Sequence, residues 1–452
     1  MTSEMAIQWA VLISALLIFF FLAPRARTIQ DFFFGSKDSN HAPNTLVLTS
    51  GLVISWIFAK SITNAAGLGA TFGLLGGIGY AGYYLSFLVA GFVLYKLRTK
   101  GKWTSIHHFL TGRYGRTATQ VFSVLISIRL FNEIWSNTMV IGSFFGEGGS
   151  SGYYVAIFVF TGLTLAYVLK GGLKASLFTD VIQMFLFALF LFVILAAVLP
   201  SFSGKPLNTD FWGTWSFDSG LDFLVLAIVQ SLSYPFHDPV LTDRAFITNP
   251  KTTRRSYIWA AILGMIFIVL FSLVGVSMRL SGHENELMGF AKGMGIPLFM
   301  VINLIMITSA TSTLDSSFSS FSKLLVVDIF KSRKVTIKAG RLAMIALAVI
   351  GTIPVFFNAE ILQATTISGT MVIGLAPVFI LWNLEVPKIS FFLSVGVGLL
   401  CGIAQTIHLI PKSWFWTSGK YADLLFINCI GTIFSFIVFI LPYLLLRWRK
   451  SQ

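Results

Sequence analysis

The chain has 452 residues, of which 56% are hydrophobic and only 11% are charged. A water-soluble protein of this length needs a more polar surface, so the composition excludes soluble globular classes and indicates a protein that crosses the lipid bilayer several times. The formal net charge is +14, but the Lys and Arg residues stand between apolar runs and not on one polar face, which argues against nucleic-acid binding. Cys401 and Cys429 lie within apolar runs, so we expect neither a disulfide framework nor a metal cluster.

About thirteen apolar runs approach the roughly 20 residues that a membrane span needs. They cover residues 5–23, 45–72, 73–98, 117–145, 152–170, 175–200, 220–247, 256–280, 296–330, 336–357, 360–382, 388–408 and 422–446. The first run has no basic region before it and no small-residue cleavage site after it. We therefore interpret it as a retained span and not as a signal peptide.

The connections between these runs alternate in charge. The basic ones are 24–44, 96–116, 170–174, 243–255, 331–341 and the C-terminal tail, whereas connections such as 146–152 and 201–219 carry at most one Lys. The connection 279–295 departs from this alternation because it carries two cations, but Glu284 and Glu286 balance their charge. The positive-inside rule therefore predicts an inner or plasma membrane protein with the N-terminus outside and the C-terminus in the cytoplasm, as an odd number of spans requires.

The order of the spans predicts an internal repeat. Without the first span and the last two, two groups of five remain, and because five is odd the second group enters the membrane with opposite polarity. This is the inverted repeat of secondary transporters. We expect an all-α, leucine-transporter-type membrane protein with an extra helix and loop at 1–44, a first repeat at 45–200, an inverted second repeat at 201–382 and two extra helices at 383–452.

The first helix of each repeat is predicted to be broken. Residues 59–69 mix small, polar and glycine residues at membrane depth, and residues 233–239 carry two prolines, which remove backbone hydrogen-bond donors. In inverted-repeat transporters, substrate and ion bind near such breaks. The alternative is a pair of packing kinks with small residues at helix contacts.

The stretch from Ser309 to Lys331 is dense in hydroxyl-bearing residues. Such groups are costly in hydrocarbon unless they meet an ion or a polar solute. Ser309, Ser312 and Thr313 have the spacing i, i+3, i+4, which places them on one helical face. Their hydroxyls could instead bond back to the carbonyl four residues earlier.

Three motifs carry a resemblance to a known family. They are Phe58-Ala-Lys-Ser-Ile-Thr63, Gly171-Gly-Leu-Lys-Ala with Thr179-Asp-Val-Ile-Gln183, and Ser312-Thr-Leu-Asp-Ser316 followed by Asp328-Ile-Phe-Lys331. In this order they resemble the sodium/solute symporter family of sodium-coupled sugar, proline, pantothenate, iodide and sialic acid transporters. The resemblance implies a symporter and not an enzyme, with Na⁺ as the coupling ion. It implies a sodium site formed by the carbonyls of Ala59, Ile62 and Ser309 and the hydroxyls of Ser312 and Thr313, and helix breaks free such carbonyls.

Some relatives have a second sodium site, which here implies Asp180 with Ser312, Asp315 and Ser316. Two carboxylates in a low dielectric favour a second cation or a shared proton, because both cannot stay bare. Alternatively, Asp180 pairs with Lys174.

Lys60 stands between the first two carbonyl ligands. An ammonium turned inward could replace sodium and make the carrier proton-coupled or ion-independent, but we favour a side chain that reaches the cytoplasmic interface. Ala65 and Ala66 stand where sugar-binding relatives are polar, so the resemblance argues against sugar transport. A membrane solute sensor of the same fold is the more distant alternative.

The substrate is expected beside the two breaks, as a small polar organic solute such as an amino acid, amide or carboxylate. The predicted substrate-binding residues are Thr63, Asn64, Arg129, Asn132, Glu133, Tyr234, His237, Asp238 and Gln363. Arg129 and Glu133 are spaced i, i+4, which favours an internal pair over an arginine that is free for a substrate carboxylate. Asp238 could receive a substrate amine, or either it or His237 could cap a half-helix. We expect His107 and His108 to be solvated, and the mechanism requires no oligomer.

Overall fold

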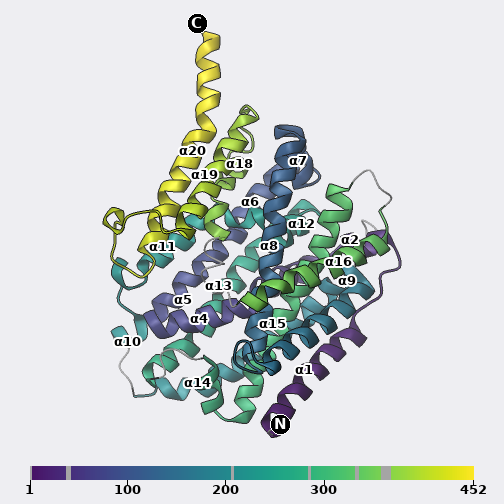
Figure 1. The fold of residues 1–452 in the computed structure, drawn as a ribbon, viewed down its shortest axis with the longest axis vertical. Helices are drawn as coiled ribbons and strands as arrows, with labels where there is room; N and C mark the ends of the chain where they lie inside the picture. The colour runs from purple at the N-terminus through teal and green to yellow at the C-terminus, as the bar shows by residue number, and fades with distance from the viewer. Residues whose placement is uncertain are drawn as a thin grey trace.

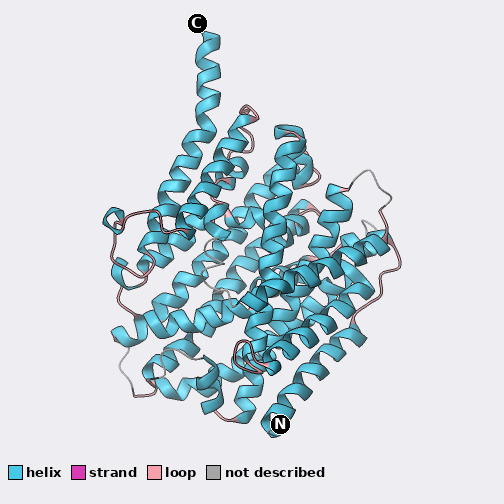
Figure 2. Ribbon diagram, viewed as in Figure 1, coloured by secondary structure: helices cyan, strands magenta, loops and turns pink. Residues whose placement is uncertain are grey.

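The computed structural model describes residues 3–36, 42–204, 208–282, 287–330, 335–357 and 368–451, and all regular structure in these ranges is helical (Figures 1 and 2). The described α-helices are α1 (Ser3–Leu22), α2 (Ile29–Phe34), α3 (Thr45–Trp56), α4 (Ala59–Phe72), α5 (Leu74–Ala81), α6 (Leu85–Thr99), α7 (Ile106–Tyr114), α8 (Arg116–Ser143), α9 (Ser151–Val198), α10 (Thr209–Trp212), α11 (Leu221–Gln230), α12 (Pro239–Arg244), α13 (Pro250–Leu280), α14 (Leu287–Gly293), α15 (Ile296–Lys323), α16 (Ile337–Thr352), α18 (Leu375–Ile380), α19 (Ile389–Thr406) and α20 (Ala422–Ser451). The bundle is elongated, with the N-terminus at one end and α20 projecting from the other (Figure 1).

Eight helical segments of the described residues are long and apolar enough to cross a membrane, or nine if the bent pair α3–α4 is one span. Ten of the thirteen predicted runs fall on these segments, but α9 and its 3-10 extension count as one segment where we predicted two. α8 covers the predicted run 117–145 and carries buried polar residues that lower its hydropathy. The run 220–247 contains the short helices α11 and α12, and part of the run 360–382 lies outside the described residues.

α9 contains the predicted break between two spans. A straight helix of its 48 residues would be about 72 Å long, more than twice the roughly 30 Å of a hydrocarbon core. Gly172 lies inside it with φ 56° and ψ −141°, which is not helical. A side chain at Gly172 would meet the backbone and ring of Phe32, so only glycine fits this join.

The first repeat helix is broken at Ile57 and Phe58, where α3 and α4 meet at 62°. We placed the break within residues 59–69, but these residues are helical and the break lies just before them. Trp56 at the end of α3 has its carbonyl exposed by the break, and the Tyr84 hydroxyl donates to it at 2.9 Å. Tertiary contacts, and not the small residues of α4, therefore stabilise the interruption.

The second predicted break is confirmed. α11 ends at Gln230, a 3-10 turn covers Tyr234–His237, and α12 begins at Pro239. Asp238 caps α12 by accepting a hydrogen bond from the Val240 amide at 2.9 Å. The two proline rings remove donors where the chain leaves one helix and enters the next.

α15 lies at the centre of the bundle and packs along α9, α8, α16 and α3, while α13 packs along α4, α5 and α6. Nearly every hydroxyl-bearing residue from Thr308 to Ser322 is buried. α19 and α20 pack against each other, and α20 also contacts α11 (Figure 1). The hydroxyl-rich stretch is therefore enclosed by both predicted repeats.

Candidate functional site

Four charged side chains meet where the two broken helices pass α8, and we call them the central charge cluster: Lys60, Arg129, Glu133 and Asp238. The Lys60 ammonium lies 2.7 Å from the Glu133 carboxylate. Arg129 forms an ion pair with Glu133, and its Nη2 atom lies 3.4 Å from the Asp238 carboxylate. All four side chains are buried. Two cations face two anions, so the cluster is neutral, as a dry interior requires.

Each member of this cluster is positioned by its element. Lys60 lies in the first turn of α4, directly after the first break. Arg129 and Glu133 are one turn apart on α8, so the expected i, i+4 pair is confirmed. Asp238 is the N-cap of α12, and the Trp56 indole donates to its carboxylate at 2.8 Å. The cluster thus joins both breaks to α8.

The expectation that Lys60 reaches the cytoplasmic interface is wrong. Its side chain is only 1% exposed, and its ammonium also donates to the Ser136 hydroxyl at 3.1 Å. Glu133 and Ser136 lie one turn apart on α8 and offer two oxygens to one ammonium. The buried Glu133 carboxylate holds the Lys60 ammonium inward by direct charge pairing, whereas the aqueous interface would offer it only solvation.

Aromatic faces enclose the Arg129 guanidinium. The rings of Phe58 and Tyr234 each have their centroids 5.3 Å from its central carbon. Trp56 contacts the Tyr234 ring edge to face at 5.7 Å. These rings come from both breaks and exclude water from the guanidinium, which strengthens its ion pairs.

The other predicted substrate-binding residues lie around this cluster, with one exception. The Thr63 hydroxyl returns to the Ala59 carbonyl at 3.2 Å, and the Asn132 amide lies 3.5 Å from the Ser368 hydroxyl. Asn64 is half-buried on α4. His237 is buried, with Nδ1 hydrogen-bonded to the Tyr234 carbonyl and no partner for Nε2 among the described residues. Gln363 lies outside the described residues.

The predicted sodium ligands lie on two packed helices. Ala59 and Ile62 are buried in the first turn of α4, and Ser309, Ser312 and Thr313 are buried on α15, which packs on α4. The Thr313 hydroxyl donates to the Ser309 carbonyl at 3.0 Å, which is the back-bonding arrangement. The Ser312 hydroxyl does not bond back but donates to the Asp180 carboxylate at 2.5 Å.

Asp180, Asp315 and Ser316 come together around an arginine that we did not predict. Arg244 lies 3.1 Å from the Asp180 carboxylate and donates to the Ser316 hydroxyl at 2.5 Å. The alternative pairing of Asp180 with Lys174 is wrong, because Lys174 pairs with Asp31 at 3.0 Å. We call the three acidic and basic side chains Asp180, Arg244 and Asp315 the arginine cluster.

In the sequence, Arg244 is one cation of the basic connection 243–255. It is 1% exposed and ends α12, one helix beyond the second break. The available signal was its position inside the predicted span 220–247, since a charge within a span is a functional-site signal. The expectation that His107 is solvated is also wrong. His107 is buried, and its Nδ1 lies 3.8 Å from the Asp328 carboxylate.

A comparison with protein families finds one match, over part of the chain. The "Sodium:solute symporter family" matches residues 32–211. This match places those residues in the sodium:solute symporter family. The resemblance inferred from the motifs is confirmed, and the matched segment contains the first break, α8 and the Gly172 join. The sodium:solute symporters are transporters and not enzymes, and the family implies sodium as a coupling ion.

Solved structures extend the likeness over the whole chain. A Na⁺-coupled sialic acid symporter in a substrate-bound, outward-open state superimposes with a TM-score of 0.71 at 18% identity, covering 98% of each chain. Mhp1, a nucleobase-cation-symport-1 family transporter, matches in a closed conformation with bromovinylhydantoin (TM-score 0.59, 12% identity, 93% of this chain and 96% of that chain). Its inward-facing conformation matches with a TM-score of 0.55 at 11% identity, covering 95% and 96%. No curated protein sequence matches this chain.

These structural likenesses confirm the predicted leucine-transporter-type fold with discontinuous first and sixth core helices. At such low identities they show the fold alone. The chain is a multi-pass membrane protein, and its residues 32–211 match the sodium:solute symporter family.

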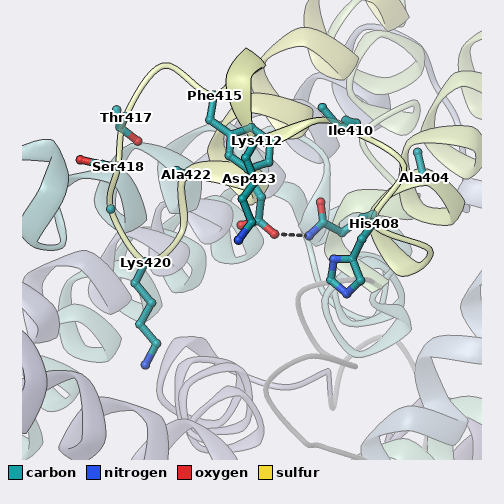
Figure 3. A pocket seen from close by; sticks show the side chains of 12 residues that line it. Ala404, His408, Ile410, Lys412, Phe415, Thr417, Ser418, Lys420, Ala422 and Asp423 are labelled. Atoms are coloured by element: carbon teal, nitrogen blue, oxygen red, sulfur yellow. Dashed lines mark hydrogen bonds between the residues drawn. The ribbon is translucent and has the colours of Figure 1, made fainter.

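One cavity of the described structure lies apart from both charged clusters. It has a volume of about 670 Å³ and is lined by residues between positions 404 and 423, in the connection from α19 to α20 (Figure 3). Gln405 donates to the Asp423 carboxylate at 2.7 Å at its wall, and Lys412 and Lys420 also line it (Figure 3). None of the predicted sodium or substrate residues that the structure describes borders this cavity.

Proposed function

We propose that the protein is a sodium-coupled secondary active symporter that imports a small organic solute, an amino acid, amide or carboxylate and not a sugar, by alternating access. The proposal rests on the central charge cluster, which is buried, neutral and built from both broken helices and α8. In inverted-repeat transporters this is where a substrate binds. The family match over residues 32–211 supports the coupling to sodium.

The charges of the cluster suit a substrate that itself carries charge. A carboxylate would engage Arg129 or Lys60, and an ammonium would engage Asp238, so that a zwitterion exchanges ion pairs without leaving a net buried charge. Ala65 and Ala66 are buried. Their side chains cannot form the hydrogen bonds that a sugar would need. The contacts to Thr63, Asn64, Asn132 and His237 would complete the recognition, with Gln363 as a further predicted contact.

The sodium ion would bind between α4 and α15. Its ligands would be the carbonyls of Ala59, Ile62 and Ser309 and the hydroxyls of Ser312 and Thr313, because a hard cation prefers oxygen. Binding would hold the two helices together, stabilise the outward-open state and order the neighbouring central cluster. Inward opening would then release ion and solute.

The proposed orientation follows the basic connections, with the N-terminus outside and the C-terminus in the cytoplasm of an inner or plasma membrane. The proposed domain order is an extra helix and loop at 1–44, repeats at 45–200 and 201–382, and two extra helices at 383–452. No oligomer is needed, because one chain contains both breaks.

A ligand screen by thermal shift in detergent tests this function. Amino acids, amides, carboxylates and sugars are added with sodium or with choline as the cation. We expect one charged solute to raise the melting temperature more in sodium, since a ligand at 100 times its Kd adds about 2.7 kcal/mol to the free energy of unfolding. A sugar as the stabilising solute would contradict the substrate class, and equal shifts in sodium and choline would contradict the coupling.

A proton-coupled or ion-independent carrier is the second candidate, because a buried ammonium lies beside the first break. In that case the Lys60 ammonium would supply the positive charge that sodium otherwise provides. Uptake of the identified solute into proteoliposomes with a proton gradient and no sodium, abolished by Lys60→Ala, would favour this carrier. We expect no uptake without sodium.

A further inference from the structure

The arginine cluster has the composition of a cation site that is already filled. Arg244 lies 3.1 Å from the Asp180 carboxylate, 2.5 Å from the Ser316 hydroxyl and 3.4 Å from the Ser176 hydroxyl. One carboxylate and two hydroxyls around one positive charge are the hard oxygen ligands that sodium also prefers. Asp180 and Arg244 are at most 1% exposed, so this charge is fully withdrawn from water.

The second carboxylate of the cluster is held by hydroxyl groups. Asp315 accepts hydrogen bonds from Ser176 at 2.7 Å and Thr179 at 3.1 Å, and from Tyr167. Ser316 also donates to it at 3.2 Å, while accepting from Arg244. Asp180 thus pairs with the guanidinium directly, Asp315 is connected to it through Ser176 and Ser316, and no second cation is paired with either carboxylate among the described residues.

The fold leaves room for the guanidinium on its remaining side. Gly51 of α3 faces the pair, and a Cβ there would lie 3.0 Å from the Asp180 carboxylate and overlap the Arg244 side chain. The backbone of Gly51 is helical within α3, so its conformation does not require glycine. The close approach of Arg244 and Asp180 does. A larger residue would displace the arginine from its carboxylate.

We propose that the Arg244 guanidinium is the permanent cation of this second site, so that each transport cycle carries a single sodium ion at the Ala59–Thr313 site. This inference rests on the proposed sodium coupling and sets its stoichiometry. Ser312 links the two sites, because its hydroxyl donates to Asp180 and its oxygen is a proposed sodium ligand. Arg244 thereby also orients a sodium ligand through Asp180.

Equilibrium binding of radioactive sodium to the purified full-length protein in detergent tests the proposal without a known substrate. We expect about one ion per chain in the wild type and about two in Arg244→Gln, where two carboxylates lose their cation. Arg244→Lys keeps a cation and should bind about one. Arg98→Gln is the matched control, because Arg98 donates to the Thr248 carbonyl at 2.6 Å and to the Thr253 hydroxyl, and pairs with no carboxylate that the structure describes.

Two bound ions in the wild type would overturn the proposal, and so would one ion in both the wild type and Arg244→Gln. No bound ion in the wild type would refute the sodium coupling, and Arg244→Gln would then decide the proposal separately: one ion gained supports it and none overturns it. If Arg244→Gln does not fold, the wild-type count decides, because one ion supports a filled second site and two refute it. The double variant Asp180→Asn/Arg244→Gln removes the charge pair together and should bind about one ion.

Discussion

Single hydroxyl groups on α15 divide into two kinds. Thr311 and Thr313 both donate to the carbonyl four residues earlier, at 2.5 Å and 3.0 Å. Only Thr313 shares a helical face with Ser309 and Ser312, the other residues proposed to bind sodium. The local hydrogen bond therefore serves packing at Thr311, whereas at Thr313 we propose that contact with a sodium ion replaces it.

This difference gives a matched pair of variants. Thr313→Ala should raise the sodium concentration needed for half-maximal stabilisation at least about tenfold, since a lost ligand worth about 1.4 kcal/mol changes affinity by that factor. Thr311→Ala removes an equivalent buried hydroxyl and should leave the sodium dependence unchanged. Thermal shift against sodium concentration measures both. Equal sodium dependence in the two variants would contradict the site.

Asp31 lies outside the spans, where a pH dependence can be predicted. Burial raises the pKa of its carboxyl, but hydrogen bonds from Lys174, the Arg27 amide and Thr28, together with the charge of Lys174, hold the pKa below its ordinary value of 3.8. Because the folded pKa is depressed, the ionised carboxylate stabilises the protein above the unfolded pKa, and this stabilisation is lost as pH falls through the folded pKa.

Asp31→Asn should therefore lower the melting temperature at neutral pH, and the gap from wild type should close only below about pH 4. Asp218→Asn is the comparison for an exposed carboxylate: hydrogen bonds from Ser418 also lower the pKa of Asp218, but both residues are exposed, so we expect a smaller gap. Thermal unfolding in detergent across this pH range gives the comparison. A gap that persists unchanged at acid pH would show that the charge of Asp31 contributes nothing.

At the scale of elements, the break in α9 depends on one residue. Gly172 combines a positive φ with a close approach to Phe32 of α2. Gly162, ten residues earlier in the same helix, has helical geometry and no atom near the place of a Cβ. The two glycines look alike in sequence and differ only in their surroundings.

Gly172→Ala should cost about 1–3 kcal/mol in the free energy of unfolding, because alanine does not tolerate this backbone conformation and its methyl group overlaps Phe32. Gly162→Ala should be neutral or slightly stabilising. The fraction of protein that stays monodisperse after heating, followed by fluorescence size exclusion, measures both. Equal heat resistance would mean that α2 and α9 rearrange without cost.

At the scale of the whole molecule, the basic connections predict the orientation in the membrane. A fluorescent protein fused after Gln452 should fold and emit, because the C-terminus is predicted to be cytoplasmic. The same fusion inserted in the connection 407–421 between α19 and α20 should stay dark in bacteria, where this fusion does not mature after export. The reverse pattern would invert the proposed topology, and alkaline phosphatase fusions at both positions provide the complementary signal.

Much of the architecture was predictable because its signals are local. Apolar length predicted the helices, proline placed the second break, and the i, i+4 spacing predicted the Arg129–Glu133 pair. The first break was misplaced because its position depends on Tyr84. This residue lies in another helix, and its hydroxyl donates to the Trp56 carbonyl. A tertiary hydrogen bond of this kind leaves no mark in the sequence around the break.

For the hydroxyl-rich stretch, a polar surface inside the membrane follows from the sequence, since apolar length and hydroxyl density are properties of one segment. The charges that contact this surface depend on tertiary packing. Lys60 turned inward to Glu133 and Arg244 reached Asp180, because buried ions bind whichever opposite charge the packing of distant helices brings within reach. Partners 73 and 64 positions apart in sequence cannot be read from local patterns.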